Sequence, residues 1–140
     1  MKEKVIRFGI SLNDKLLSSF DKTISSEGYT NRSEAIRDLI REKLISKEWI
    51  KGKREVVGVI TFVYSHHARE LDSHLINFQH HNYKLIISST HIHLNEENCL
   101  EVIISRGKPQ EIQKIADLIK SFRGVKHITL SMTTTGENIL

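Results

Sequence analysis

The 140-residue chain has a single cysteine, Cys99, and a single proline, Pro109. One cysteine excludes an intrachain disulfide and is typical of a reducing compartment, so we expect a cytoplasmic protein. No apolar run reaches the about 18 residues that a membrane-spanning helix needs. The first residues alternate in polarity and lack the continuous apolar core of a signal peptide. The sequence therefore predicts no membrane partner.

The excess of one sign of charge is also small. The chain has 21 basic and 17 acidic residues, a formal net charge of +4. That balance permits nucleic-acid binding but is only weak support for it. Histidine is the abundant residue instead: all eight lie from His66 onward, and seven lie between His66 and His93. This region is where metal-binding chemistry is expected.

The first fifty residues predict one strand followed by two helices. Phe8, Ile10 and Leu12 alternate with polar positions, which indicates a half-buried strand over residues 5–12. Asn13 or Asp14 can cap a helix that ends at Gly28, and Asn31 can cap the next one. An isolated strand leaves its hydrogen-bonding groups unpaired, and so short a segment buries too little apolar surface to fold alone. We therefore expect an obligate dimer whose two strands pair as a ribbon, which fits the DNA major groove.

At this point the segment resembles the ribbon-helix-helix family of DNA-binding proteins. The stretch from Asn31 to Arg37 is similar to the start of that family's second helix, whose amide end sits on a DNA phosphate. The resemblance implies five DNA-contacting residues: Arg7, Gly9, Ser11, Asn31 and Arg32. The better-known members carry Ser or Thr where this chain has Gly9, so base readout there is lost or passes to the backbone. The operator sequence is expected to differ accordingly.

A polar stretch, residues 51–55, separates this segment from the next and predicts a linker between domains 1–50 and 56–140. The second segment predicts four strands and two helices in the order βαββαβ, an α+β fold of the split ferredoxin-like type, similar to ACT domains. The predicted strands are residues 56–64, 85–94, 99–105 and 125–132. The predicted helices are residues 67–81 and 109–122.

Metal-binding residue types cluster around the second and third of these strands. His91 and His93 lie two residues apart on a strand, so their imidazoles share a face, and Cys99 returns beside them after a short loop. A further ligand is available in the Gln79-His80-His81 stretch at the end of the preceding helix. Imidazole and thiolate donors exclude Mg²⁺ and Ca²⁺. They suit Zn²⁺ in a tetrahedral site and Ni²⁺ or Cu²⁺ in a planar one, with zinc the commonest occupant.

Taken together, roughly residues 5 to 135 resemble the nickel-responsive transcriptional regulators of the NikR family. The resemblance is carried by both domains and by three motifs in fixed order: Gln79-His80-His81, His91-Ile92-His93 and Asn98-Cys99-Leu100-Glu101. It implies one Ni²⁺ per subunit in a square-planar site, held by His91, His93 and Cys99 with His80 of a neighbouring subunit. Gln79 and Glu101 match positions that orient such ligands. A site shared between subunits implies a homotetramer, a dimer of dimers.

The predicted function is a nickel-dependent regulator, a repressor of nickel-uptake genes, that binds double-stranded operator DNA. The alternative is a metal-buffering or trafficking protein that binds nickel, copper or zinc without sequence-specific DNA recognition. No enzyme and no small-molecule substrate are expected, because a closed four-ligand site leaves no open position for a substrate. Two further sets stay open: His66, His67 and His74 as secondary metal sites, and Glu34 with Asp38 as a cation site at the domain interface.

Overall fold

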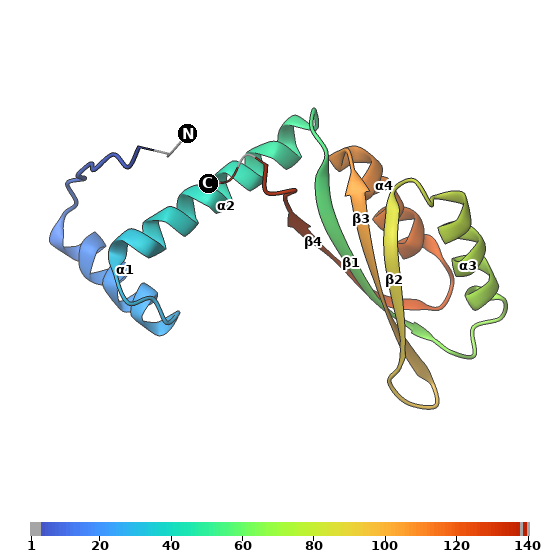
Figure 1. The fold of residues 1–140 in the computed structure, drawn as a ribbon. Helices are drawn as coiled ribbons and strands as arrows, with labels where there is room; N and C mark the ends of the chain where they lie inside the picture. Colours follow the sequence, from blue (N-terminus) through green and yellow to red (C-terminus); the bar gives the residue numbers. More distant parts are fainter. Residues whose placement is uncertain (1–3, 138, 140) are drawn as a thin grey trace. The chain divides into compact units, whose positions relative to one another are not determined.

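The computed structural model of the chain describes residues 4–137 and residue 139 (Figure 1). They divide into two compact units, one ending at Ile40 and one beginning at Arg41. Residues 52–55 are in neither helix nor strand. The predicted division into 1–50, 51–55 and 56–140 stays a prediction. Across the described residues, no helix combines the length and apolar character needed to cross a membrane.

The first unit contains helix α1 (Asp14–Ser26) and the start of helix α2 (Arg32–Lys51), which continues past Ile40. Both begin at an asparagine cap, as the sequence predicts. The Asn13 side chain accepts a hydrogen bond from the backbone N–H of Leu16 at 2.8 Å, and the Asn31 side chain accepts one from Glu34 at 2.9 Å. Each cap satisfies a backbone donor that the first helical turn leaves unpaired.

Gly28 ends α1 and turns the chain toward α2. It adopts the left-handed conformation with a φ of 87°, which costs a residue without a Cβ little. The backbone N–H of Gly28 donates to Ser25 at 3.3 Å, and that of Tyr29 donates to Ile24 at 3.0 Å. This is the hydrogen-bond pattern of a Schellman motif.

The strand predicted for residues 5–12 is not formed in the structure of the single chain. Residues 4–13 are in neither helix nor strand, and Phe8 and Ile10 are 69% and 58% exposed. The physical reason is that a strand needs a hydrogen-bonded neighbour, and the described residues of this unit offer none. The alternating apolar side chains are thus present, but the described residues of one chain include no paired strand that would bury them.

The second unit holds the last part of α2 and a four-stranded antiparallel sheet with two further helices, α3 (Leu71–His81) and α4 (Pro109–Ser121). Its strands are β1 (Val56–Ser65), β2 (Ile86–His93), β3 (Asn98–Gly107) and β4 (Val125–Thr133). Their order across the sheet is β2-β3-β1-β4 (Figure 1). The α+β class and the βαββαβ order are confirmed, and β2 and β3 form the predicted hairpin.

Within the second unit, the start of α3 is where the prediction misses by the largest margin. The helix was expected from residue 67 and begins at Leu71, because the chain first makes a turn in which Leu71 donates to the Ala68 carbonyl at 3.2 Å. Glu70, at the cap position, has a left-handed φ of 62° and makes no side-chain cap hydrogen bond. Residues 67–70 therefore lie outside α3. His66 precedes them and directly follows the last residue of β1.

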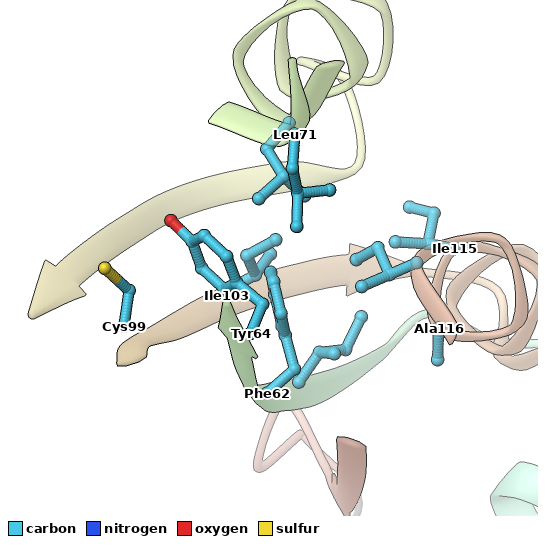
Figure 2. Packing of buried hydrophobic residues seen from close by; sticks show 10 residues of the cluster. Phe62, Tyr64, Leu71, Cys99, Ile103, Ile115 and Ala116 are labelled. Atoms are coloured by element: carbon cyan, nitrogen blue, oxygen red, sulfur yellow. The ribbon is translucent and has the colours of Figure 1, made fainter. Parts of the chain in front are cut away.

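The core of this unit lies between the helices and one face of the sheet. Figure 2 shows Phe62 and Ile103 from the sheet with Leu71 and Ile115 from the two helices, and Cys99 at the margin of the same cluster. A smaller cluster joins Trp49, Val56 and Ile112, and the Trp49 indole N–H donates to the Thr133 carbonyl at 2.8 Å. The metal-binding residue types therefore sit beside a packed core.

Candidate functional site

The register of the β2–β3 hairpin brings the predicted ligands to one place. His93 lies opposite Cys99, and His91 lies opposite Glu101. Since successive residues of a strand point to opposite faces, these four side chains share the face that α3 and α4 cover. Tyr64 of β1 lies opposite Cys99 on the other side of β3 and joins the same face.

Three side chains are close enough to hold one metal ion: His66, His93 and Cys99. One donor atom from each lies within 4.8 Å of the others. The Cys99 Sγ atom is 3.5 Å from His93 Nδ1 and 3.6 Å from His66 Nδ1. Cys99 is completely buried, whereas both histidines are exposed. The thiol thus belongs to the core, and the two imidazoles lie between it and the surface.

His91 lies next to this group but is engaged elsewhere. Its ring centroid is 4.8 Å from that of His93. Its Nδ1 atom is 2.9 Å from the Tyr64 hydroxyl and 3.8 Å from a carboxylate oxygen of Glu101. In the single chain, therefore, His66 and not His91 completes the three-donor group. The assignment of His91 as a metal ligand stays a prediction.

Gln79 and Glu101, the predicted orienting residues, contact each other directly. The Gln79 amide donates to Glu101 Oε1, and the Gln79 carbonyl accepts from the Ser89 hydroxyl at 2.8 Å. Glu101 is only 5% exposed, so its carboxylate is fixed between α3 and β2. Their role toward a bound metal remains a prediction.

His80 lies in the last turn of α3 and its side chain is exposed. Among the described residues, it is not part of any group that could hold a metal ion within one chain. This is the arrangement expected of a residue that acts on another subunit, and that role stays a prediction.

Burial and negative charge shift the titration of the site. Burial, followed by the charges of Asp72 and Glu101, raises the pKa of the Cys99 thiol above its ordinary value of 9.0. Burial also raises the pKa of Glu101, although hydrogen bonds from Gln79 and the neighbouring His91 oppose that rise. The pKa of Tyr64 is raised by burial and by the same two carboxylates. At neutral pH the thiol is thus protonated until a cation binds.

The donor set fits a soft or borderline divalent metal ion. Two imidazoles and a thiol match zinc, nickel or copper, and lack the oxygen ligands that magnesium and calcium prefer. A metal ion held only by these three side chains would keep at least one coordination position open, which a further histidine can fill.

The predicted DNA-contacting residues lie in the first unit. Arg7, Gly9 and Ser11 are exposed within residues 4–13. The Asn31 side chain caps α2, as described above. Arg32 is paired with Asp21, with its Nε atom 2.7 Å from Asp21 Oδ1. DNA binding by these residues is a prediction that a single chain does not test.

Comparison with known proteins identifies both units. Residues 57–133 match the family model of the NikR C-terminal nickel-binding domain, and residues 6–47 match that of the copG family of ribbon-helix-helix proteins. The chain is 53% identical over 137 residues to a protein of Caldanaerobacter subterraneus subsp. tengcongensis, an alignment that covers 98% of this chain and 89% of that protein. The chain belongs to the nickel-responsive regulator family.

Other relatives in the nickel-responsive regulator family match this chain over nearly their whole length. A protein of Geobacter metallireducens is 52% identical over 136 residues, covering 97% of this chain and 98% of the relative. One of Pyrococcus furiosus is 49% identical over 136 residues, covering 97% and 99%. All three relatives are named as nickel-responsive regulators. The family therefore combines a ribbon-helix-helix DNA-binding domain with a nickel-binding domain in one chain.

In this chain, the sequence alone gave His66 too little weight as a metal-binding candidate and missed Tyr64 and Asp72. His66 directly follows β1, and its backbone N–H donates to the Glu97 carbonyl at 2.8 Å, which ties it to the hairpin loop. The fold order could have predicted this position of His66. In a βαββαβ sheet the first strand lies antiparallel beside the third, so the residue after the first strand lies near the start of the third. No sequence signal pointed to Tyr64, because its polar partners come from α3 and β2.

Proposed function

We propose that the chain is a nickel-dependent repressor of nickel-uptake genes that binds operator DNA when nickel occupies its second domain. The observation that carries the proposal is the pairing of His93 with the buried Cys99 at 3.5 Å, beside His91, in a domain that matches a nickel-binding family. Sequence-specific regulation by nickel needs both this site and a DNA-reading unit, and the chain has both.

The proposed ligands are His91, His93 and Cys99 of one subunit with His80 of a neighbouring subunit, for one Ni²⁺ per subunit. Nickel supplies a divalent charge that stabilises the Cys99 thiolate, and the four side chains bind it. Support comes from the shared face of the three hairpin residues and the exposed position of His80. His66 is a candidate additional donor, since its Nδ1 atom lies 3.6 Å from the Cys99 sulfur.

A homotetramer is the proposed assembly, built as a dimer of dimers. The first unit supports dimerisation because its apolar side chains are exposed in one chain: Leu39 is 53% and Leu16 is 54% exposed. The sheet face away from the helices also carries exposed apolar residues, with Ile92 at 42% and Ile104 at 37%. Exposed apolar area of this kind is typical of surfaces that a second copy buries.

DNA recognition is assigned to Arg7, Gly9 and Ser11 on the paired ribbon, with Asn31 and Arg32 at the phosphates. Their exposure supports this assignment. Coupling to nickel follows from linkage: nickel must bind the DNA-competent arrangement more tightly, and DNA must in return raise the affinity for nickel by the same factor.

The test is a fluorescence-anisotropy titration of the full chain against DNA from the promoter of a nickel-uptake gene, with added NiSO₄ and with EDTA. We expect nickel to tighten specific binding and the variant Arg7→Ala to lose it while still binding nickel. Lys15→Ala, a change on α1 outside the ribbon, serves as the control. Equal affinity with and without nickel would reject the regulator and favour a metal-buffering protein.

A further inference from the structure

A chain of polar side chains runs from the first turn of α3 to β2, and the proposed ligand set does not explain it. The Tyr64 hydroxyl lies 3.1 Å from Asp72 Oδ1 and 2.9 Å from His91 Nδ1. Tyr64 is 1% exposed, so its hydroxyl is held in place by the core. In Figure 2 the Tyr64 ring lies between Cys99 and Leu71, the first residue of α3.

The hydrogens of this chain can be assigned by counting donors. A tyrosine hydroxyl has one hydrogen, and an ionised aspartate can only accept. The Tyr64 hydroxyl therefore donates to Asp72, which leaves its oxygen to accept a hydrogen from His91 Nδ1. The other group near Nδ1, a carboxylate oxygen of Glu101 at 3.8 Å, is also an acceptor. Every neighbour recorded for His91 Nδ1 thus favours a hydrogen on that nitrogen.

We propose that Asp72 is a positioning residue that acts through Tyr64 to fix His91 in the Nδ1–H tautomer, so that its Nε2 lone pair faces the metal. The inference rests on the proposed function, in which His91 is a nickel ligand. A ligating histidine commonly donates its second ring N–H to a protein acceptor, which fixes both the tautomer and the ring orientation. Here the acceptor is the hydroxyl of the buried Tyr64, which can accept because its own hydrogen goes to Asp72, an exposed aspartate on α3.

Without Asp72, the Tyr64 hydroxyl loses its acceptor and should donate to His91 Nδ1 instead. That reversal puts the histidine hydrogen on Nε2, which can no longer bind a metal ion without losing it. The charge of Asp72 could act on a cation independently of this relay, and Asp72→Asn separates the two effects. Asparagine keeps an acceptor oxygen for Tyr64 and removes the charge.

The first experiment measures the tautomer of His91 by ¹⁵N-detected long-range correlation NMR on the metal-free protein, at a pH where the imidazole is neutral. Wild type and Asp72→Asn should show the Nδ1–H form. Asp72→Ala should shift the ring toward Nε2–H, and Tyr64→Phe should weaken the preference for Nδ1–H to what the Glu101 carboxylate alone supports. Asp117→Asn, an exposed acid on α4, is the control and should match wild type. An unchanged His91 tautomer in folded Asp72→Ala would overturn the proposal.

The second experiment is a titration of the same variants with NiSO₄, read by the nickel absorption spectrum. Asp72→Ala should weaken nickel binding about 10-fold, at the lower end of the range for outer-shell partners, and Asp72→Asn should restore most of it. If Asp72→Asn loses as much affinity as Asp72→Ala, charge and not the tautomer is responsible and the proposal is wrong. Failure of wild type to bind nickel would reject the proposed function alone, because the NMR measurement needs no metal.

Discussion

Arg32 and Asp21 form a two-point ion pair, with Nε 2.7 Å from one carboxylate oxygen and Nη2 2.7 Å from the other. The guanidinium fork fits one planar anion in this way at a time. Arg32 is also one of the residues proposed to lie at the DNA phosphates. If its guanidinium binds a phosphate, that contact and the pairing with Asp21 would compete for the same donors.

Replacing Asp21 with asparagine should strengthen DNA binding. The change releases Arg32 for a phosphate, so the slope of log affinity against log salt concentration should become steeper by about one unit. Anisotropy titrations over a range of KCl concentrations, with nickel present, measure that slope. Asp14→Asn, on the same helix, removes the same charge and should leave the slope closer to that of wild type. A slope identical in both variants would mean that Arg32 does not reach the DNA.

The same ion pair makes a small contribution to stability that depends on pH. The hydrogen bond from Arg32 holds the pKa of Asp21 below its ordinary value of 3.8. A carboxyl group with a lowered folded-state pKa stabilises the fold above its unfolded pKa, and this contribution disappears as the pH falls through the folded pKa. Urea denaturation should thus find wild type slightly more stable than Asp21→Asn at pH 7. A difference that persists at the same size well below pH 3.8 would contradict this assignment.

Changing Cys99 to serine should affect the metal and the fold together. Loss of the thiolate should weaken nickel binding by more than about 100-fold, beyond the range for outer-shell changes. Cys99 is fully buried, and the shorter C–O bond of serine should place its hydroxyl too far from His66 and His93 for good hydrogen bonds, which should cost about 1–3 kcal/mol of unfolding free energy. Nickel titration and urea denaturation measure the two effects. Asp117→Asn, a change at an exposed residue on α4, is the control and should change neither.

Nickel binding should release a proton from Cys99. The raised pKa of its thiol keeps it protonated at neutral pH, and a metal ligand must be the thiolate. Nickel affinity should therefore increase with pH through the neutral range. Calorimetry in buffers of different ionisation enthalpy counts the protons released. Binding without proton release would exclude the thiol as a ligand.

A charge on the open face of the sheet should dissociate the tetramer. Ile104 is 37% exposed on β3, and Ile104→Glu would bring an unpaired carboxylate into the proposed contact between copies. Light scattering after size-exclusion chromatography should then find dimers. Leu118→Glu, a residue on α4 that is 42% exposed, is the matched control and should stay tetrameric. Tetramers in both variants would place the contact elsewhere.

The sequence predicted the second unit well because its signals are local. Alternation along β1 and the apolar positions of α4 are set by which side chains face the core, and both elements end within one residue of the prediction. The N-terminal strand was different. Its pattern from Phe8 to Leu12 depends on a second copy, so one chain keeps the residues exposed and unpaired.

The candidate site could be predicted only as far as its residues are close in sequence. His93 and Cys99 are joined by one hairpin, and their contact follows from its register. The contacts of His66 with Cys99 and of Tyr64 with His91 join residues 33 and 27 positions apart. Such contacts depend on the sheet order and on where α3 begins, and the prediction for the start of that helix was too early.

The complete burial of Cys99 should also slow its oxidation. A thiol with no exposed surface and a raised pKa offers little thiolate to peroxide, and a disulfide between two copies would require the core to open. If Cys99 is a metal ligand, loss of the metal should therefore not leave a reactive sulfur at the surface. The thiol should then bind and release the metal repeatedly without a reductase to restore it.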